Sequence, residues 1–435
     1  MGNTYNYLKN VLLKAKEEVK NNPFVVLVTL AIITIPLHYR YSSIAIMLLT
    51  AFSLFQLKNK KFYFQKKLFL LVLLYVLMVL SLTWTIDTKL TTSALLKGLS
   101  FLLIPFCFFL NPPLSEENKD SIIKYYSYAF FGYSIFYLIK ASIRFLITND
   151  SSVFFYHELV TFDVNAIHVS VYIAIAFFWF LNKKIKTNLD KIALIALFIL
   201  LFLLSSKNII IVFLLLLGLS ILFVLKLKTR RLYVVLGVGI VLGIVFFGKI
   251  KDRFLIEIES NQASGKINSE ISGQTGLVYN VSIKEAWTKD QFQPNDYFPG
   301  TALRVYQTRI FAEIIREDNR ILTGYGINAT DAKIKQKRIQ HNLYHEYDKF
   351  NFHNQYIQIF AELGVVGFVL LVLILWINLK NAIKTKHFVH FSFAILMISL
   401  FLTESFLSRQ RGIVFFILLF CLFNSKTEKK IAIKE

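Results

Sequence analysis

The stretch HNQYIQIFAELGVVGFVLLVLILWIN, residues 353–378, decides the class of fold. It starts with polar residues and then stays apolar for as long as the roughly 20 residues that a helix needs to cross a bilayer. Glu362 is its only acidic residue, and it contains no Lys or Arg. We therefore predict a transmembrane helix whose polar first turn, next to the imidazole of His353, lies at the membrane surface.

Comparable apolar runs recur along most of the chain. Of its 435 residues, 55% are hydrophobic and 17% are charged, which is more apolar surface than a soluble domain needs. Runs long enough to cross roughly 30 Å of hydrocarbon predict about twelve spans. They lie near 24–38, 42–57, 68–84, 94–111, 125–147, 165–181, 190–205, 208–225, 232–248, 354–378, 389–405 and 411–424. The first two spans, and the two around Ser205-Ser206-Lys207-Asn208, remain open as re-entrant hairpins, which would lower the count without changing the sidedness.

The basic residues predict the orientation, because Lys and Arg in short loops are retained on the cytoplasmic side. Four basic loops fall on one side in this count, together with the Lys-rich N-terminus and the C-terminal tail. These loops are 58–61, 183–186, 226–231 and 380–386. Both termini are therefore predicted to be cytoplasmic. The predicted organisation is an N-terminal transmembrane bundle of about nine helices (1–248), a large outer loop (249–352), about three C-terminal transmembrane helices (353–425) and a cytoplasmic tail (426–435).

The formal charge of +22 is explained mainly by those cytoplasmic loops. No compact basic module with interleaved aromatic residues is present, so we expect no nucleic-acid partner. Cys107 and Cys421 both fall within predicted spans, where they pack as small apolar residues, and they imply no disulfide framework. The first apolar run follows a long polar stretch and lacks a small-residue cleavage site, so we interpret it as a retained helix.

The outer loop changes character near its middle. Residues 256–300 are polar and rich in Asn, Gln, Ser and Gly, which predicts a mobile surface segment. Over 301–322 apolar residues recur at near-helical spacing, and Gly324-Tyr325-Gly326 provides a stop. A second helical stretch, near 329–340, is strongly polar, and we interpret it as a solvated cover.

Five cationic side chains are predicted on the outer face, against the positive-inside bias. Lys207 lies in the turn between the seventh and eighth spans, Arg304 and Arg309 in the 301–322 helix, and Arg409 and Arg411 in the last outer turn. Arg presents a planar fork of donors suited to phosphate oxygens. Several such cations together can neutralise a diphosphate.

Structural alternatives remain open for most of these cations. Arg309 can pair with Glu313 one helical turn on, a surface pair that contributes about 0.3–0.5 kcal/mol. The two arginines of the last outer turn have Glu404 or lipid headgroups within reach, and Lys207 stands where a cation can cap a helix end. Arg304 has no obvious local acidic partner, which favours a binding role.

His353 itself has two interpretations. It is either an interfacial imidazole hydrogen-bonded to a carbonyl or a reactive group at the membrane edge. Asn354 and Tyr356 add hydrogen-bonding groups within one turn, and Gly364 and Gly367 let another helix approach closely. Such packing would hold the His-bearing end rigidly, as a catalytic group requires.

Other ionisable residues have weaker patterns. Glu362 lies roughly opposite His353 on the helical wheel, so we expect it to make a structural polar contact instead of pairing with the imidazole. His341 and His345 have the spacing of a helical metal pair, but they lack a third ligand and a His-Glu-x-x-His context, so no metal site is predicted. Asp87, in a short outer loop, suits cation-dependent chemistry or an ordinary loop role.

Residues 353–367, HNQYIQIFAELGVVG, resemble the signature of the O-antigen ligase and O-antigen polymerase superfamily of polytopic membrane proteins. The upstream stretch from Arg304 to Gly326 is similar to the arginine-bearing outer-loop helix of that family. Ser205-Ser206-Lys207-Asn208 is similar to its Ser-Arg-Gly-type turn, with Lys207 in place of Arg. The motif His-Asn-x-Tyr followed by Glu-x-Gly-x-x-Gly is specific for the superfamily and does not separate its members.

The resemblance implies an all-α, GT-C-like polytopic enzyme of the bacterial inner membrane. It would transfer a glycan from polyprenyl (undecaprenyl) diphosphate to an acceptor hydroxyl at the periplasmic face, with inversion and without a metal or other cofactor. A general base typically contributes about 10²–10⁴-fold to such a step, and cations stabilise the leaving-group charge. The implied roles are base for His353, diphosphate binding for Arg304, Arg309, Arg409 and Lys207, and support for Asn354, Tyr356 and Glu362.

The identity of the acceptor stays open. A lipid A-core sugar would make the protein a ligase, the end of another lipid-linked repeat a polymerase, and a protein hydroxyl a protein glycosylation enzyme. A transporter or flippase of lipid-linked glycans is the alternative from another class. Many transporters are built from two related halves, and the absence of an internal repeat argues against that alternative.

Overall fold

The computed structural model describes residues 22–428 except 60, 162, 205, 226–266 and 268–276. The predicted span 232–248, the basic loop 226–231 and much of the predicted mobile segment lie outside the described residues. Within them, each predicted span coincides with a helix or with two consecutive helices.

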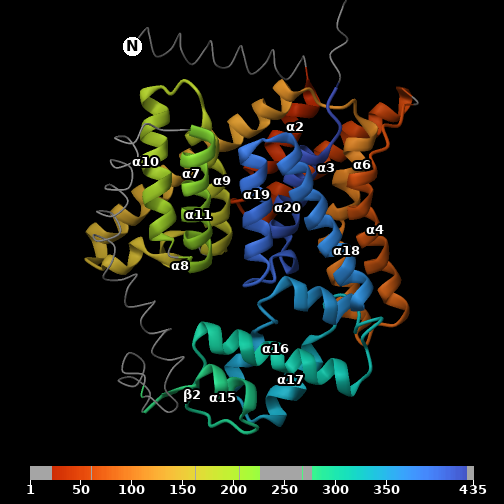
Figure 1. The fold of residues 1–435 in the computed structure, drawn as a ribbon, viewed down its shortest axis with the longest axis vertical. Helices are drawn as coiled ribbons and strands as arrows, with labels where there is room; N and C mark the ends of the chain where they lie inside the picture. Colours follow the sequence, from red (N-terminus) through yellow and green to blue (C-terminus); the bar gives the residue numbers. More distant parts are fainter. Residues whose placement is uncertain are drawn as a thin grey trace, which may run out of the picture.

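A bundle of apolar helices makes up most of the described chain (Figure 1). By length and composition, five segments suit a membrane crossing: Tyr39–Lys58, Lys66–Thr83, Thr88–Leu110, Glu116–Thr148 and Gln355–Thr385. The helices of the bundle are α2 (Pro23–Ile33), α3 (Tyr39–Phe55), α4 (Lys66–Leu80), α5 (Thr88–Gly98), α6 (Ser100–Leu110), α7 (Glu116–Thr148), α8 (Tyr156–Leu159), α9 (Ala166–Asn182), α10 (Asn188–Leu203), α11 (Lys207–Leu219), α18 (Gln355–Thr385), α19 (Phe388–Leu400) and α20 (Gln410–Asn424). The chain is an all-α membrane protein, as the sequence predicts.

Capping residues explain why two helices begin earlier than their apolar runs. Helix α7 starts at Glu116 instead of near 125, because the Ser115 hydroxyl accepts the Asn118 N–H at 3.1 Å. Helix α5 starts at Thr88 instead of near 94, because the Asp87 carboxylate accepts the Leu90 N–H at 2.9 Å. Asp87 is therefore an N-cap in this structure.

A small domain, called here the loop domain (277–352), lies at one end of the bundle (Figure 1). It contains α15 (Ile283–Thr288), α16 (Gly300–Glu317) and α17 (Asp331–Gln340), with a parallel pair of two-residue strands, β1 (Tyr279–Asn280) and β2 (Asp296–Tyr297). Its own apolar core is centred on Phe292, Phe298, Tyr306 and Ile310. The domain is thus packed as a unit and does not form a loose connection.

Helix α17 corrects the prediction of a solvated cover. The side chains of Lys337 and Arg338 in this helix are buried, and Arg338 is 0% exposed. One guanidinium nitrogen of Arg338 donates to the Tyr347 carbonyl, and Nη2 donates to the Phe350 carbonyl at 2.7 Å. The polarity of this helix reflects buried hydrogen-bonding groups as well as solvent exposure.

Helix α18 is kinked at Gly364, which has φ 66° and ψ −168°. The backbone of 321–326 fits into this kink. The Val365 N–H donates to the Ile321 carbonyl at 2.8 Å, and the Tyr325 N–H donates to the Ala361 carbonyl at 2.9 Å. This strand-like pairing fastens the loop domain to the first turns of α18.

The kink corrects two sequence-based expectations. Helix α16 ends at Glu317, not at Leu322, because Asn319 adopts a left-handed conformation and the following residues run along α18. The close approach at Gly364 is made by the backbone of Leu322 and not by another helix. Only glycine offers both the positive φ and the missing Cβ that this contact requires.

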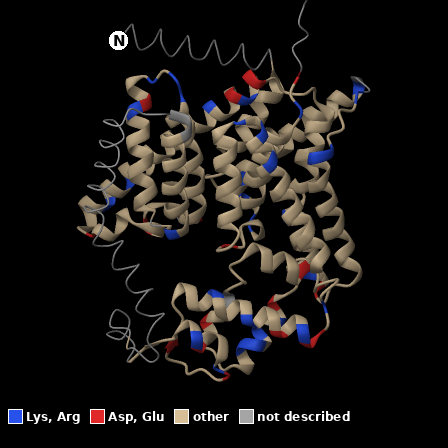
Figure 2. Cartoon of the chain, in the orientation of Figure 1, with Lys and Arg blue, Asp and Glu red and all other residues tan. Residues whose placement is uncertain are grey.

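Charged residues lie mostly near the two ends of the bundle and over the loop domain (Figure 2). The first and last turns of several helices carry them, such as Lys66 and Lys67 at the start of α4 and Lys384 near the end of α18. The middle of the bundle is formed by aliphatic and aromatic side chains, as expected for helices in hydrocarbon.

Candidate active site

His353 lies at the end of the bundle that carries the loop domain, one residue before the N-cap of α18. It has φ 48°, a left-handed conformation that is uncommon for a non-glycine residue and that concentrates at functional sites. Its N–H donates to Oδ1 of Asn351 at 3.0 Å. Asn354 then caps α18, and its Oδ1 accepts the N–H groups of Tyr356 and Ile357. The cap fixes the backbone directly beside the imidazole.

Glu404 lies in the loop between α19 and α20 and faces His353. Nδ1 of His353 lies 3.7 Å from Oε2 of Glu404, and the two side chains are 26% and 13% exposed. From the sequence, Glu404 is a candidate partner only for Arg409 or Arg411. A carboxylate beside Nδ1 favours the tautomer with the proton on Nδ1 and leaves Nε2 as the basic nitrogen. The pair can therefore orient a base.

Burial by itself would raise the pKa of Glu404, but the neighbouring imidazole of His353 outweighs it. The charges of His168 and Arg304 act in the same direction, and the net effect is a pKa below the ordinary 4.5. The carboxylate is therefore ionised at neutral pH. A negative charge beside the imidazole stabilises the imidazolium that forms when the base takes a proton.

Arg304 and the start of α11 converge on Thr403, the residue before Glu404. Nε of Arg304 donates to the Thr403 carbonyl at 3.2 Å, and its Nη1 donates to the Gly300 carbonyl at 3.0 Å. Nδ2 of Asn208 donates to Oγ1 of Thr403 at 2.9 Å. The structure thus brings Arg304 beside the His353–Glu404 pair, with the first turn of α11, which begins at Lys207, next to the same loop.

A cavity of about 620 Å³ opens beside His353. Glu404 and Arg409 line it together with His353, and the opposite wall comes from the segment that joins α7 to α9. Arg409 is exposed and directly precedes α20. The remaining lining residues are Tyr156, His157, Asp163, Val164, Asn165, Ile167, Phe350 and Asn351. The cavity combines a base, a cation and several hydrogen-bonding groups, which suits a polar substrate.

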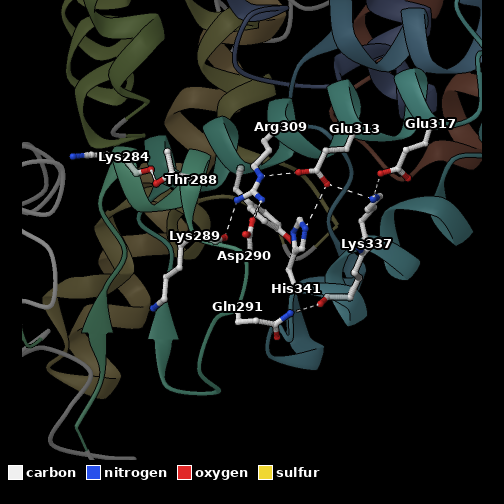
Figure 3. A network of polar contacts seen from close by, with 12 residues as sticks. Lys284, Thr288, Lys289, Asp290, Gln291, Arg309, Glu313, Glu317, Lys337 and His341 are labelled. Atoms are coloured by element: carbon white, nitrogen blue, oxygen red, sulfur yellow. Dashed lines mark hydrogen bonds and ion pairs between the residues drawn. The ribbon is translucent and has the colours of Figure 1, made fainter.

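Arg309 lies elsewhere, in the polar network of the loop domain (Figure 3). Its Nε donates to Glu313 at 2.7 Å, its Nη2 contacts Asp290 at 2.8 Å, and its Nη1 donates to the Lys289 carbonyl at 2.7 Å. The side chain is 10% exposed. The structural alternative considered from the sequence, pairing with Glu313, is the arrangement seen here.

His341 belongs to the same network (Figure 3). Its Nδ1 lies 3.0 Å from Oη of Tyr306, and its Nε2 lies 3.4 Å from Glu313. Burial lowers the pKa of His341 despite the opposing charge of Glu313, so the imidazole is neutral at pH 7. In the part of the chain that the structure describes, no group of three or more His, Cys, Asp or Glu side chains is arranged to hold a metal ion.

The other residues singled out from the sequence make structural contacts. Oη of Tyr356 donates to the Ile398 carbonyl at 3.0 Å and joins α18 to α19. Glu362 is 3% exposed and accepts from Nε2 of Gln358 at 2.6 Å, a polar contact within α18. Arg411 donates to the Leu37 carbonyl, which ties the last outer turn to the loop after α2.

Arg338 is a further residue that sequence reasoning missed. Its two carbonyl contacts, at Tyr347 and Phe350, hold the segment that leads into His353, and the Phe350 ring packs on the imidazole at 5.6 Å between centroids. The only local signal was that Arg338 follows Ile334, a buried apolar residue, by one helical turn. The path of 345–352 across α17 could not be derived from spacing.

Replacing Glu404 with Gln should change how stability depends on pH. Because the folded-state pKa of Glu404 is depressed, its carboxylate stabilises the fold above about pH 4.5, and this contribution is lost as the pH falls through the folded-state pKa. We expect the thermal midpoint of Glu404→Gln to lie below that of the wild type at pH 7 and the gap to shrink below about pH 4.5.

The matched control for that measurement is Glu158→Gln. Glu158 pairs with Arg144 at 2.6 Å, but its side chain is 58% exposed. Exposed pairs contribute little at any pH, so the control should follow the wild type. A constant gap between Glu404→Gln and the wild type from pH 7 to pH 3 would contradict the assignment of the depressed pKa to this carboxylate.

Fold and site together define an all-α membrane protein with a histidine–carboxylate pair at the rim of a cavity, beside a helical loop domain. Residues 192–372 match the family model described as O-antigen ligase. The match spans α11, Arg304, His353 and the kinked start of α18, and it supports the O-antigen ligase and polymerase superfamily. No curated protein matches the chain at a significant level.

The family match and the apolar helices support the function in general terms. They indicate a bacterial membrane protein, and the matched family supports glycan transfer of the O-antigen ligase or polymerase type, with glycan and lipid-linked substrates in general. The resemblance inferred from residues 353–367 is confirmed by this match.

Proposed function

We propose that the protein transfers a glycan from polyprenyl diphosphate to an acceptor hydroxyl in the cavity beside His353. The observation that carries the proposal is the position of the imidazole, with Nδ1 next to Glu404 and the rest of the ring at the cavity rim. Arg409 lines the same cavity, and Arg304 contacts the residue before Glu404. A base and two cations are therefore gathered where a lipid-borne diphosphate and an acceptor would meet.

His353 acts as the general base in this proposal. Its Nε2 takes the proton from the acceptor hydroxyl as the oxygen attacks the anomeric carbon of the donor. The bond between that carbon and the phosphate oxygen breaks, and the electron pair leaves with polyprenyl diphosphate. Attack from the face opposite the leaving group inverts the anomeric configuration. The imidazolium is stabilised by Glu404 until the proton passes to solvent.

Arg304 and Arg409 stabilise the charge that develops on the leaving diphosphate. Arg304 is held by two carbonyl contacts, and Arg409 lines the cavity directly before α20. Lys207 is the first residue of α11, next to Asn208, which contacts the same loop, and it is proposed as a third cation. Arg309 holds the loop domain together and does not bind the donor. Protein cations supply the charge stabilisation, so the proposed transfer is metal-independent.

The reaction face is proposed to be periplasmic, with both termini cytoplasmic, in the bacterial inner membrane. The support is the distribution of basic residues. The loops that carry Lys58, Lys183 and Lys384 lie at the end of the bundle opposite the loop domain (Figures 1 and 2), and such loops are retained inside. The donor would then reach the site from the outer leaflet.

Ligase and polymerase differ in the acceptor, and a knockout separates them. Loss of all attached polymer with accumulated lipid-linked chains indicates a ligase that uses a lipid A-core acceptor. Surface glycans that stop at single attached repeats indicate a polymerase. If the acceptor is a protein hydroxyl, the knockout should lack the corresponding glycoprotein.

Arg304→Ala and Arg309→Ala should fail in different ways. We expect Arg304→Ala to insert and fold normally and to lose about 10²–10³-fold in transfer rate, the loss typical of removing one stabilising donor. Arg309→Ala should lose about 1–3 kcal/mol of loop-domain stability, because Glu313 and the Lys289 carbonyl lose their donor. Single-turnover rates and thermal midpoints of the purified variants measure the two effects.

The comparison has a clear contrary result. If the folded fraction of Arg309→Ala retains the wild-type rate constant, Arg309 is structural. If it instead folds normally and loses as much rate as Arg304→Ala, Arg309 binds the donor and the division of roles proposed for the two arginines is wrong.

A further inference from the structure

A second polar cavity, of about 490 Å³, lies at the end of the bundle opposite the loop domain. It is formed where α4 and α7 begin and where α18 and α20 end, so four segments distant in sequence meet there. Its lysines are Lys66, Lys67, Lys119 and Lys426, and its carboxylates are Glu116 and Asp120. The transfer reaction proposed above uses none of these groups.

Lys119 makes this cavity a built site and not a loose surface patch. It is 8% exposed, and its Nζ donates to the Ser425 carbonyl at 2.9 Å and to Oγ1 of Thr427 at 3.0 Å. Its carboxylate partner, Glu116, lies 3.7 Å away and is itself bound by Thr427. These contacts hold the ammonium group in a fixed position at the wall of the cavity, beside the carboxylate of Glu116.

The other lysines carry charge that neutral groups do not offset. Nζ of Lys67 donates to Oδ1 of Asn381 at 2.6 Å, and Nζ of Lys426 donates to the Phe64 carbonyl at 3.1 Å. In the described residues neither forms an ion pair. The neutral oxygens orient the ammonium groups without cancelling them, which leaves the cavity basic.

Buried polar groups form the floor of the cavity. Asn424 is 3% exposed, and its Nδ2 donates to Oδ1 of Asn378 at 2.8 Å, whereas its own Oδ1 has no hydrogen-bond partner among the described residues. His390, which also lines the cavity, is stacked on Phe423 at 4.7 Å. The floor of the cavity therefore combines hydrogen-bonding groups with apolar walls.

A neighbouring cavity of about 570 Å³ adds more lysines, Lys124, Lys183, Lys184 and Lys386. The two cavities share Asp120 and His387, whose side chains lie 3.6 Å apart. The shared pair separates two basic recesses at one end of the bundle. Their combined lining holds eight lysines and two carboxylates, and one of these lysines, Lys183, is paired with Asp190 outside the lining at 2.7 Å.

We propose that the cavity centred on Lys67, Lys119 and Lys426 binds the phosphate group of an acidic phospholipid. Basic pockets between transmembrane helices at the cytoplasmic end of a bundle recognise such headgroups, because lysines attract the phosphodiester and the helices accommodate the acyl chains. Phe64, which lines the cavity and is 43% exposed, provides an apolar rim for those chains. The lipid lies at the opposite end from the transfer site and fixes the relative positions of four helices.

The test measures lipid binding to the full-length protein, not transfer activity. Purified wild type in neutral detergent is titrated with phosphatidylglycerol, with cardiolipin or with phosphatidylcholine, and native mass spectrometry counts the bound lipid while the thermal midpoint is recorded. We expect the two acidic lipids to bind and to raise the midpoint, and phosphatidylcholine to do neither. The double variant Lys67→Gln/Lys426→Gln should bind the acidic lipids at least about tenfold more weakly than the wild type.

Lys58→Gln is the matched control, because Lys58 is exposed at the same end and does not line the cavity. It should bind acidic lipid like the wild type. Equal affinity for acidic and zwitterionic lipid, or an unchanged affinity in the double variant, would overturn the proposal. If millimolar inorganic phosphate displaces the lipid, and phosphate alone produces the same midpoint shift, the cavity binds free phosphate. That result would overturn the lipid assignment.

Discussion

Cells whose only copy of the protein is His353→Ala should lose transferred surface glycan, with a rate about 10²–10⁴-fold below the wild type. The imidazole is the basic group at the cavity rim, and Glu404 orients it through Nδ1. Alanine removes both the base and the partner of that carboxylate. Surface glycan separated on a gel, with protein quantified by immunoblot, measures the effect.

His345→Ala is the matched control for that substitution. His345 also lies in the loop domain, but its side chain is 71% exposed and lies 3.6 Å from the carboxylate of Glu346. Its glycan pattern should equal that of the wild type. An unchanged glycan pattern from stably inserted His353→Ala protein would remove His353 from the mechanism.

Gly364→Ala should destabilise the protein more than other small substitutions in the bundle. A Cβ at this position would lie 2.0 Å from the Leu322 carbonyl oxygen, and the residue has φ 66°. This positive-φ conformation, which is essentially restricted to glycine, costs an alanine roughly 1–3 kcal/mol, and the clash adds about 1–3 kcal/mol. The strand-like pairing of 321–326 with α18 should open, so we expect a lower thermal midpoint and faster proteolysis of the loop domain.

Gly132→Ala provides the comparison within a helix. A Cβ at Gly132 would meet nothing within 4 Å, and its φ is ordinary, so the midpoint should stay near that of the wild type. Equal midpoints for Gly364→Ala and Gly132→Ala would show that 321–326 is not fastened to α18 in the way described here.

The sequence was sufficient for the class of protein, and it singled out His353, the residue on which the proposed site is centred. Apolar runs determine helices directly, because a backbone in hydrocarbon must satisfy its own hydrogen bonds. His353 was identifiable because its motif is local, and all of its residues lie within fifteen positions of one another. Arg304 was favoured for a reason that is also local, the absence of a nearby acid.

Long-range partners were not accessible in this way. Glu404 follows His353 by 51 positions, and their contact depends on how α18 and α19 pack, which periodicity does not specify. Arg338 is buried because 345–352 crosses α17, and a polar composition alone suggested exposure. The family motif marked Gly364 as special, but the neighbour that requires a glycine, the backbone of Leu322, is 42 residues away in sequence.

The most direct test of the central claim is turnover by purified protein with a lipid-linked glycan donor and its acceptor. We predict a new glycosidic bond of inverted configuration, released polyprenyl diphosphate in equal amount, and no turnover above background with His353→Ala. If the wild-type protein only moves the donor across a bilayer and forms no glycosidic bond, or if His353→Ala turns over at the wild-type rate, the account of a histidine-based glycan transfer is contradicted.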